Sequence, residues 1–106
     1  MRMKLVEITD AFVTRLRGEQ ARIALLGRLG ELNEGDVLEV DFEGVGHMTP
    51  SFADECFGKL AVDVGRETIG TRLRLINANA PVRAVVNTVI TNRLAQHART
   101  TPTAQQ

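Results

Sequence analysis

Ser51 stands at a position where a hydroxyl group can be chemically modified or can stabilise a helix. It follows Thr49 and Pro50, which together predict a helix start, because threonine caps free N–H groups and proline fits the first helical position. A phosphate added to a hydroxyl in that first turn is favoured by the nearby N–H groups and the helix dipole. The simpler role for Ser51 is that of a cap, with Asp54 three residues later as in a capping box.

Carboxylates precede and follow this helix start. Asp41 ends an apolar strand, and binding clefts of α/β sheets form at the carboxyl ends of strands, although hydrogen bonding to the following turn is the more common role. Asp54 and Glu55 fall in the first helical turn, where negative charge suits the helix dipole. The three carboxylates can in principle coordinate Mg²⁺, but their spacing does not establish the geometry that this ion needs. We therefore predict no metal site.

The remaining reactive residues do not combine into a catalytic site. His47 lies beside the turn without another histidine or a cysteine close enough in sequence for a zinc site or a catalytic dyad. Cys56 is predicted to be a small buried residue. The Gly44–Gly46 stretch lacks the Gly-Lys-Ser/Thr ending of a phosphate-binding loop. We expect no catalytic residues, no cofactor and no enzymatic activity.

A modest basic cluster, Arg15, Arg17 and Arg22, precedes and enters the first expected helix. Two interpretations remain open for it: a solvated face, or a docking surface for an acidic partner or a phosphate.

Alternating strand and helix patterns predict how these residues are positioned. Residues 4–9 have strand character, and the β-prone residues 11–14 are a plausible hairpin partner. A helix is expected from Gly18, with an apolar stripe at helical spacing. The nearly continuous apolar run of residues 37–42 predicts a central strand covered on both faces.

Beyond the Thr-Pro start, a helix is expected over residues 50–64. Its apolar stripe comprises Ala53, Phe57, Leu60, Ala61 and Val64. Residues 72–77 predict another strand, and the helical spacing of apolar residues between Val82 and Ile90 predicts a final helix after an Asn-Pro cap. The pattern indicates an α/β fold of about four mostly parallel strands with helices packed on them. We assign residues 1–98 to one domain and expect 99–106 to be a flexible tail.

Composition limits the classes of partner. Thirteen basic and thirteen acidic residues leave the 106-residue chain without net charge, and it has four Phe but no Trp or Tyr. Neither feature favours nucleic-acid binding. Apolar runs are too short for a membrane span or a signal peptide, and one cysteine cannot form an internal disulfide, so we expect a cytoplasmic protein. The sequence does not specify the oligomeric state.

Residues 40–55 resemble the hallmark of the STAS superfamily, which is typified by bacterial anti-sigma-factor antagonists. Asp41 at the end of a buried strand, the Gly44-Val45 pair and Ser51 before a helix fall at matching places. The sequence pattern DF-x-GV followed by SFADE-x-FG is more similar to a divergent STAS-like family. The resemblance continues through Leu75-Ile76-Asn77-Ala78-Asn79 into the final helix. Thr49 departs from the pattern, since an aspartate usually opens this turn. Pro50 and Phe52 depart as well, because they replace small residues.

The resemblance implies a STAS-like fold and a regulatory protein-interaction domain that acts as a switch through residues 49–55. It makes Ser51 the candidate phosphoacceptor, and it implies a GHKL-type ATP-binding kinase or a signalling ATPase as the partner. The interface expected on this basis comprises Asp41, His47, Thr49, Ser51, Asp54 and Glu55. The alternative is a small-ligand or nucleotide-binding STAS-like module without catalysis.

Overall fold

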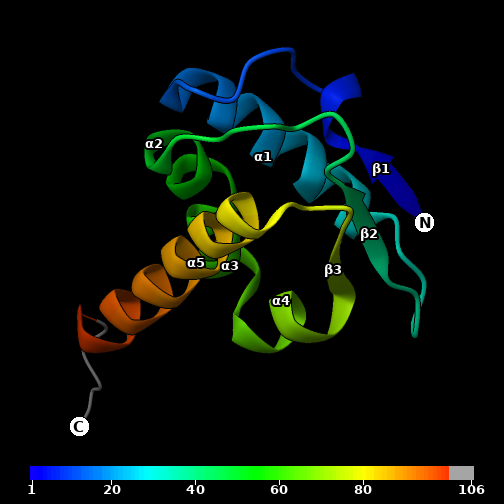
Figure 1. Ribbon diagram of the computed structural model, residues 1–106. Helices are drawn as coiled ribbons and strands as arrows, with labels where there is room; N and C mark the ends of the chain where they lie inside the picture. The colour runs from blue at the N-terminus through cyan, green and yellow to red at the C-terminus, as the bar shows by residue number, and fades with distance from the viewer. Residues whose placement is uncertain (101–106) are drawn as a thin grey trace, which may run out of the picture.

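Three parallel strands form the sheet of the computed structural model, which describes residues 1–100 (Figure 1). They are β1 (Arg2–Lys4), β2 (Leu38–Asp41) and β3 (Leu73–Ile76), in the order β1-β2-β3. The register pairs Met3 with Val40 and Val40 with Leu75. The predicted α/β class and the central position of the strand within residues 37–42 are therefore confirmed.

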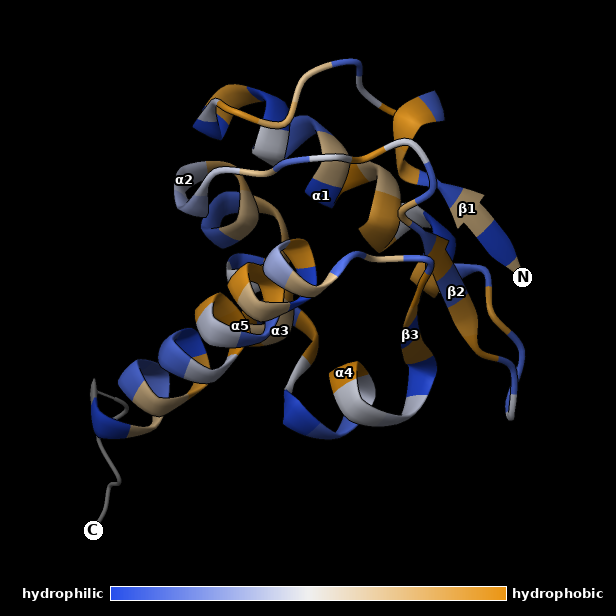
Figure 2. Ribbon diagram, viewed as in Figure 1, coloured by the Kyte–Doolittle hydropathy of each residue, from blue (hydrophilic) through white to orange (hydrophobic). Residues whose placement is uncertain are grey.

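The two faces of the sheet differ in character. Leu38 and Val40 of β2 are fully buried and belong to the hydrophobic core. Glu39 alternates with them and points to the opposite face, where Arg2 and Arg74 each approach its carboxylate at 3.5 Å. Figure 2 shows the apolar residues gathered on the strands and on the inner turns of the helices. The helices thus pack against the apolar face of the sheet, and the prediction that the central strand is covered on both faces is wrong, because the Glu39 face carries partly exposed ion pairs.

The N-terminal region differs from the prediction. β1 spans Arg2–Lys4 rather than residues 4–9, because residues Leu5–Glu7 form a 3₁₀ turn that buries Leu5. Residues 11–14 do not form a hairpin strand: the carbonyl of Phe12 accepts a hydrogen bond from the Thr49 N–H at 3.0 Å instead of pairing with β1. The sheet of the described residues consequently has three strands rather than about four.

Helix α1 (Arg15–Gly30) crosses from β1 to β2. It begins three residues before the predicted start, because Thr14 is its N-cap and accepts a hydrogen bond from the Arg17 N–H at 3.2 Å. Ala21 and Leu25 are fully buried, as their spacing predicted.

The predicted helix over residues 50–64 is present and continuous. It consists of α2 (Pro50–Ala53), a five-residue π-helical segment (Asp54–Gly58) and α3 (Lys59–Val64). Phe57 and Leu60 are fully buried, and the Phe57 ring stacks on Phe42 with centroids 5.6 Å apart. The π-helical segment was not predicted.

Two further helices complete the fold. The short α4 (Arg66–Arg72) was not predicted, since it has seven residues, includes Gly70 and presents no helical apolar stripe. Helix α5 (Ala80–Thr100) confirms the helix predicted from the valine spacing, and Asn79 caps it by accepting a hydrogen bond from the Val82 N–H at 2.9 Å.

Of the predicted flexible tail, Arg99 and Thr100 belong to α5, and residues 101–106 lie outside the described residues. Within residues 1–100, no helix has the length and apolar character needed to span a membrane.

Candidate functional site

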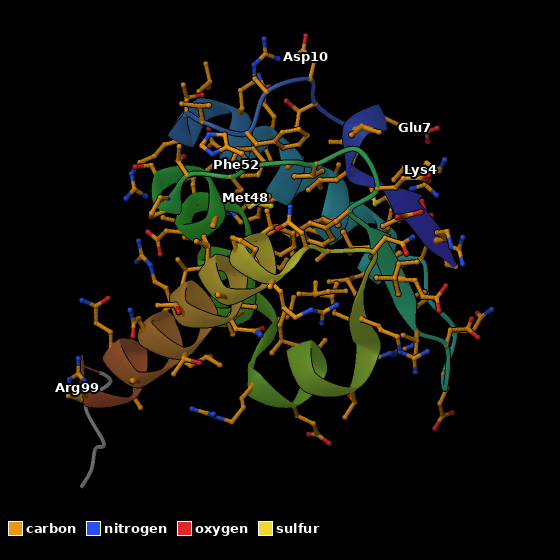
Figure 3. All side chains as sticks on the ribbon, in the orientation of Figure 1. Lys4, Glu7, Asp10, Met48, Phe52 and Arg99 are labelled. Carbon is orange, nitrogen blue, oxygen red and sulfur yellow. The ribbon has the colours of Figure 1, made fainter. Side chains whose placement is uncertain are left out.

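The start of α2 is held by Thr49. Its hydroxyl oxygen accepts a hydrogen bond from the Phe52 N–H at 3.2 Å and donates to the carbonyl of Val13 at 2.6 Å. Phe52, labelled in Figure 3, is fully buried and meets the edge of the Phe12 ring with centroids 5.5 Å apart. The loop before α1 and the start of α2 are therefore fixed against each other.

Ser51 is exposed in the first turn of α2. Since Thr49 is the N-cap, the Ser51 hydroxyl is not needed for capping, and the alternative cap position considered from the sequence is wrong. A shallow cavity of about 180 Å³ adjoins this turn, and Pro50 lines it together with Ala84, Val85, Thr88 and Val89 of α5. Ser51 thus follows directly on a residue that lines an apolar depression.

Asp41 lies at the carboxyl end of β2 and is almost completely buried. Its Oδ1 accepts hydrogen bonds from the Asn77 side-chain amide and from the Glu43 backbone N–H, each at 2.9 Å. These bonds, with that from Asn77 the stronger influence, hold the pKa of Asp41 below its usual value. Asp41 therefore stabilises the turn after β2 and ties it to the end of β3, as the simpler sequence interpretation predicted.

The loop that follows Asp41 is joined to the start of α5. The Asn79 side chain donates from Nδ2 to the carbonyl of Gly46 at 3.1 Å. Asn77 adopts φ of 58°, a left-handed conformation that asparagine tolerates better than most residues. His47 is exposed to solvent on the loop that follows Asp41.

Asp54 is held by two arginines from different helices. Arg93 of α5 binds it in a bidentate manner, from Nε to Oδ1 at 2.8 Å and from Nη2 to Oδ2 at 2.7 Å. Arg15 of α1 donates to Oδ2 at 3.0 Å. The hydrogen bonds from Arg93 first, and then those from Arg15, lower the pKa of Asp54 even though partial burial opposes them.

Glu55 is buried and faces three cationic side chains. Lys59 approaches one carboxylate oxygen at 3.0 Å and Arg22 approaches it at 3.5 Å, while Arg15 donates to the other at 3.3 Å. Burial by itself raises the pKa of Glu55, but the hydrogen bonds from Lys59 and Arg15 outweigh it, so the pKa is lowered. Glu55 and Lys59 are four residues apart on the helix, a spacing that favours an ion pair.

The π-helical segment has a specific partner in Arg22. At its end the Lys59 N–H donates to the carbonyl of Asp54, five residues back, rather than to that of Glu55. The Glu55 carbonyl instead accepts from Arg22 Nε at 2.9 Å. Arg22 therefore stabilises both the backbone and the side chain of Glu55.

Two glycines allow the helices to approach closely at this point. A Cβ atom on Gly18 of α1 would lie 2.7 Å from the Phe52 carbonyl oxygen, and one on Gly58 would lie 2.7 Å from Asp54 Oδ1 and 2.9 Å from Arg93 Cγ. Side chains at these positions would separate α1 and α5 from the π-helical segment. The glycines thus let the arginines reach Asp54 and Glu55.

The structure divides the predicted site residues between two hydrogen-bond networks. Asp41 joins the strand-end network with Asn77, whereas Asp54 and Glu55 join the arginine network. Across residues 1–100, no group of three or more His, Cys, Asp or Glu is placed to hold a metal ion. Of the basic cluster, Arg15 and Arg17 are exposed, as a solvated face predicts, although Arg15 also binds Asp54 and Glu55 and Arg17 lies 3.9 Å from Asp10. Arg22 is largely buried against Glu55, which neither interpretation predicted. Arg93 was missed, since no local spacing links it to Asp54.

Comparison with known families assigns the central part of the chain to a described domain family. The model of the STAS-like domain of unknown function (DUF4325) matches residues 24–83, more than half of the chain. The chain belongs to this STAS-like family. The match includes Asp41, Ser51, Asp54 and Glu55 but not Arg15, Arg22 and Arg93. In this STAS-like protein, the parts of α1 and α5 outside the matched range therefore supply arginines that bind carboxylates within it. Comparisons with curated proteins and with solved structures give no significant match.

Proposed function

We propose that this STAS-like domain is a regulatory protein-interaction module whose partner surface is the turn and helix start at residues 49–55, with Ser51 as its phosphoacceptor. The observation that carries the proposal is the exposure of Ser51 in the first turn of α2, where Thr49 already serves as cap. A kinase can reach such a hydroxyl, and its modification leaves the capping bond of the helix intact. Ser51 is also the only serine in the sequence.

The charges near Ser51 are compatible with the same role. Asp54 and Glu55, three and four residues later, lie on the same side of the helix and would repel a phosphate. Their carboxylates are paired with Arg15, Arg93, Arg22 and Lys59, which offsets part of that repulsion. The phosphate adds a charge of about −1.5 to −2 beside an otherwise apolar depression. Its main effect is therefore on binding rather than on folding.

The resemblance to anti-sigma-factor antagonists suggests the class of partner, a GHKL-type ATP-binding kinase or a signalling ATPase, and a cytoplasmic setting. Such a partner would cover the exposed Ser51 and the depression lined by Pro50 and Val85. His47 lies two residues before this surface, Thr49 opens it, and the ion-paired Asp54 and Glu55 lie at its end. Asp41 is buried at the end of β2, where it binds Asn77 and the Glu43 backbone instead. We assign no catalytic role to the domain.

The small-ligand alternative has less support. The depression beside Ser51, at about 180 Å³, is smaller than the 300–1,000 Å³ of typical ligand pockets. Asp41, the residue expected to face a strand-end cleft, is occupied by two donors from its own chain.

The test measures Ser51 modification and partner capture together. Wild type, Ser51→Ala and Ser51→Asp serve as baits in extracts of the native organism, and quantitative mass spectrometry records captured proteins and phosphoserine. We expect one ATP-binding partner whose affinity changes about tenfold or more in Ser51→Asp, with melting temperatures of the three proteins within a few degrees. The control is Thr91→Asp, which adds the same charge at an exposed site on α5. Equal capture by all baits, with no phosphoserine, would refute the proposal.

A further inference from the structure

Helix α1 exposes a stripe that its own fold leaves uncovered. Residues 16, 20, 23, 27 and 30 follow the four-three spacing of a helix–helix seam, and all five are exposed. Leu16 is 64% and Ile23 61% exposed, the two highest values among the large exposed hydrophobic residues of the described chain. We call this set, Leu16, Gln20, Ile23, Gly27 and Gly30, the α1 stripe.

The stripe is bulky at one end and bare at the other. Leu16 at its start and Ile23 at its centre are bulky, whereas Gly27 and Gly30 in its second half carry no side chain. A Cβ at either glycine would meet no atom within 4 Å, so packing inside the domain does not require glycine there, in contrast to Gly18. Glycine within a helix is unfavourable compared with alanine. A close approach by another backbone would account for both glycines.

The basic start of α1 runs against its own dipole, and acidic residues follow its end. Its first turn has no acidic residue but contains Arg15 and Arg17, and Glu31 and Glu34 follow its end. Helix dipoles favour the reverse arrangement. Arg28 in the last turn does suit the dipole, but it lies about 160° around the helix from Gly30 and so farther from the stripe than Glu31, at about 100°. A second helix lying antiparallel would place acidic residues beside the basic start and basic residues beside the acidic end.

We propose that the α1 stripe is a self-association surface, on which α1 of a second copy of this chain packs in the antiparallel direction. A twofold axis between Ile23 and Gly27 sets Ile23 of each helix against Gly27 of the other copy. The same axis brings Arg17 of each copy towards Glu31 of its partner copy. A parallel pair would place bulk against bulk and arginine against arginine. Shape and charge therefore select one occupant and one direction.

The expected association is weak. Sixteen residues of α-helix extend about 24 Å, and one such face buries less than the roughly 800 Å² per partner of a standard stable interface. The apparent mass of the full chain should rise from 11.6 kDa towards twice that value between about 10 µM and 1 mM. Sedimentation velocity across this range measures it directly.

Two stripe variants and one control test the surface. Ile23→Glu should weaken association about tenfold or more. Gly27→Leu should do the same by filling the bare half, although it adds apolar surface and leaves the domain folded with an equal or higher melting temperature. Val6→Glu, which also replaces an exposed apolar residue, should associate like wild type. A wild type that stays at 11.6 kDa up to 1 mM, or a Gly27→Leu variant that associates more strongly, would overturn the proposal.

Charge reversal tests the direction. Arg17→Glu should weaken association several-fold at low salt, and adding Glu31→Arg to the same chain should restore it. Failure of the double variant to recover, with circular dichroism showing it folded, would rule out the antiparallel arrangement. Neither variant touches Ser51 or the arginine network, so the outcome is independent of the partner surface at residues 49–55.

Discussion

The helical stretch from Pro50 to Val64 contacts its surroundings in two different ways. Phe52, Phe57 and Leu60 are fully buried among apolar side chains, and those contacts have little directional requirement. Asp54 and Glu55 contact α1 and α5 through charge-assisted hydrogen bonds that need defined positions and angles. The apolar contacts supply most of the stability, and the ionic contacts specify where the two flanking helices lie. Each set should respond to a different kind of perturbation.

Removing the Phe57 ring should have the largest effect. The ring is fully buried and stacked on Phe42, so Phe57→Ala should lower the free energy of unfolding by about 3–5 kcal/mol. Urea denaturation at pH 7 and pH 5 measures it, and the loss should be the same at both because no ionisable group contributes. A loss below about 1 kcal/mol would show that the apolar contacts are not the main source of stability.

Closing the gap between helices should have an intermediate effect. Gly18→Ala places a methyl group 2.7 Å from the Phe52 carbonyl oxygen, so it should cost about 1–3 kcal/mol of unfolding free energy through overpacking. Gly27→Ala in the same helix is the matched control: it meets open space and should stabilise by up to about 1 kcal/mol. Thermal denaturation of both proteins tests the difference, and equal stabilities would contradict the close approach at Gly18.

Breaking the ionic contact should have the smallest effect, and the effect should depend on pH. Asp54 is 19% exposed, which moderates its contribution, so Asp54→Asn should cost roughly 1–2 kcal/mol at pH 7. Because folding lowers the pKa of Asp54, its contribution is complete above the ordinary aspartate pKa of about 4. It is lost as the pH falls through the lower folded value.

Denaturant titrations between pH 7 and pH 2.5 should therefore show wild type and Asp54→Asn converging in acid. Asp63→Asn is the control, since Asp63 also pairs with an arginine but is 41% exposed, and it should change stability by less than about 0.5 kcal/mol. A difference between wild type and Asp54→Asn that persists unchanged at pH 2.5 would show that it does not arise from the ion pair.

Features specified by neighbouring residues were predictable, and those that depend on distant partners were not. Thr49-Pro50 identified the start of a helix, and the apolar run before Phe42 identified the central strand. Residues 11–14 have the composition of a strand, but the same residue types also suit an extended loop. The carbonyls of this loop bind Thr49, which lies 36 and 37 residues away in the sequence, so the local pattern could not distinguish the two. The partners of Arg15 and Arg22 lie on another helix, so spacing along the sequence could not reveal them.

The π-helical segment at residues 54–58 also affects how this helix should be aligned with those of its relatives. A π-turn holds one residue more than the α-helical turn it replaces, so each residue from Lys59 onward is rotated by about 100° relative to an uninterrupted helix. Alignment with a family member whose helix is regular therefore requires a one-residue gap within these five positions. Without that gap, Leu60 would be paired with a residue on another face, and buried apolar positions would be matched to exposed polar ones.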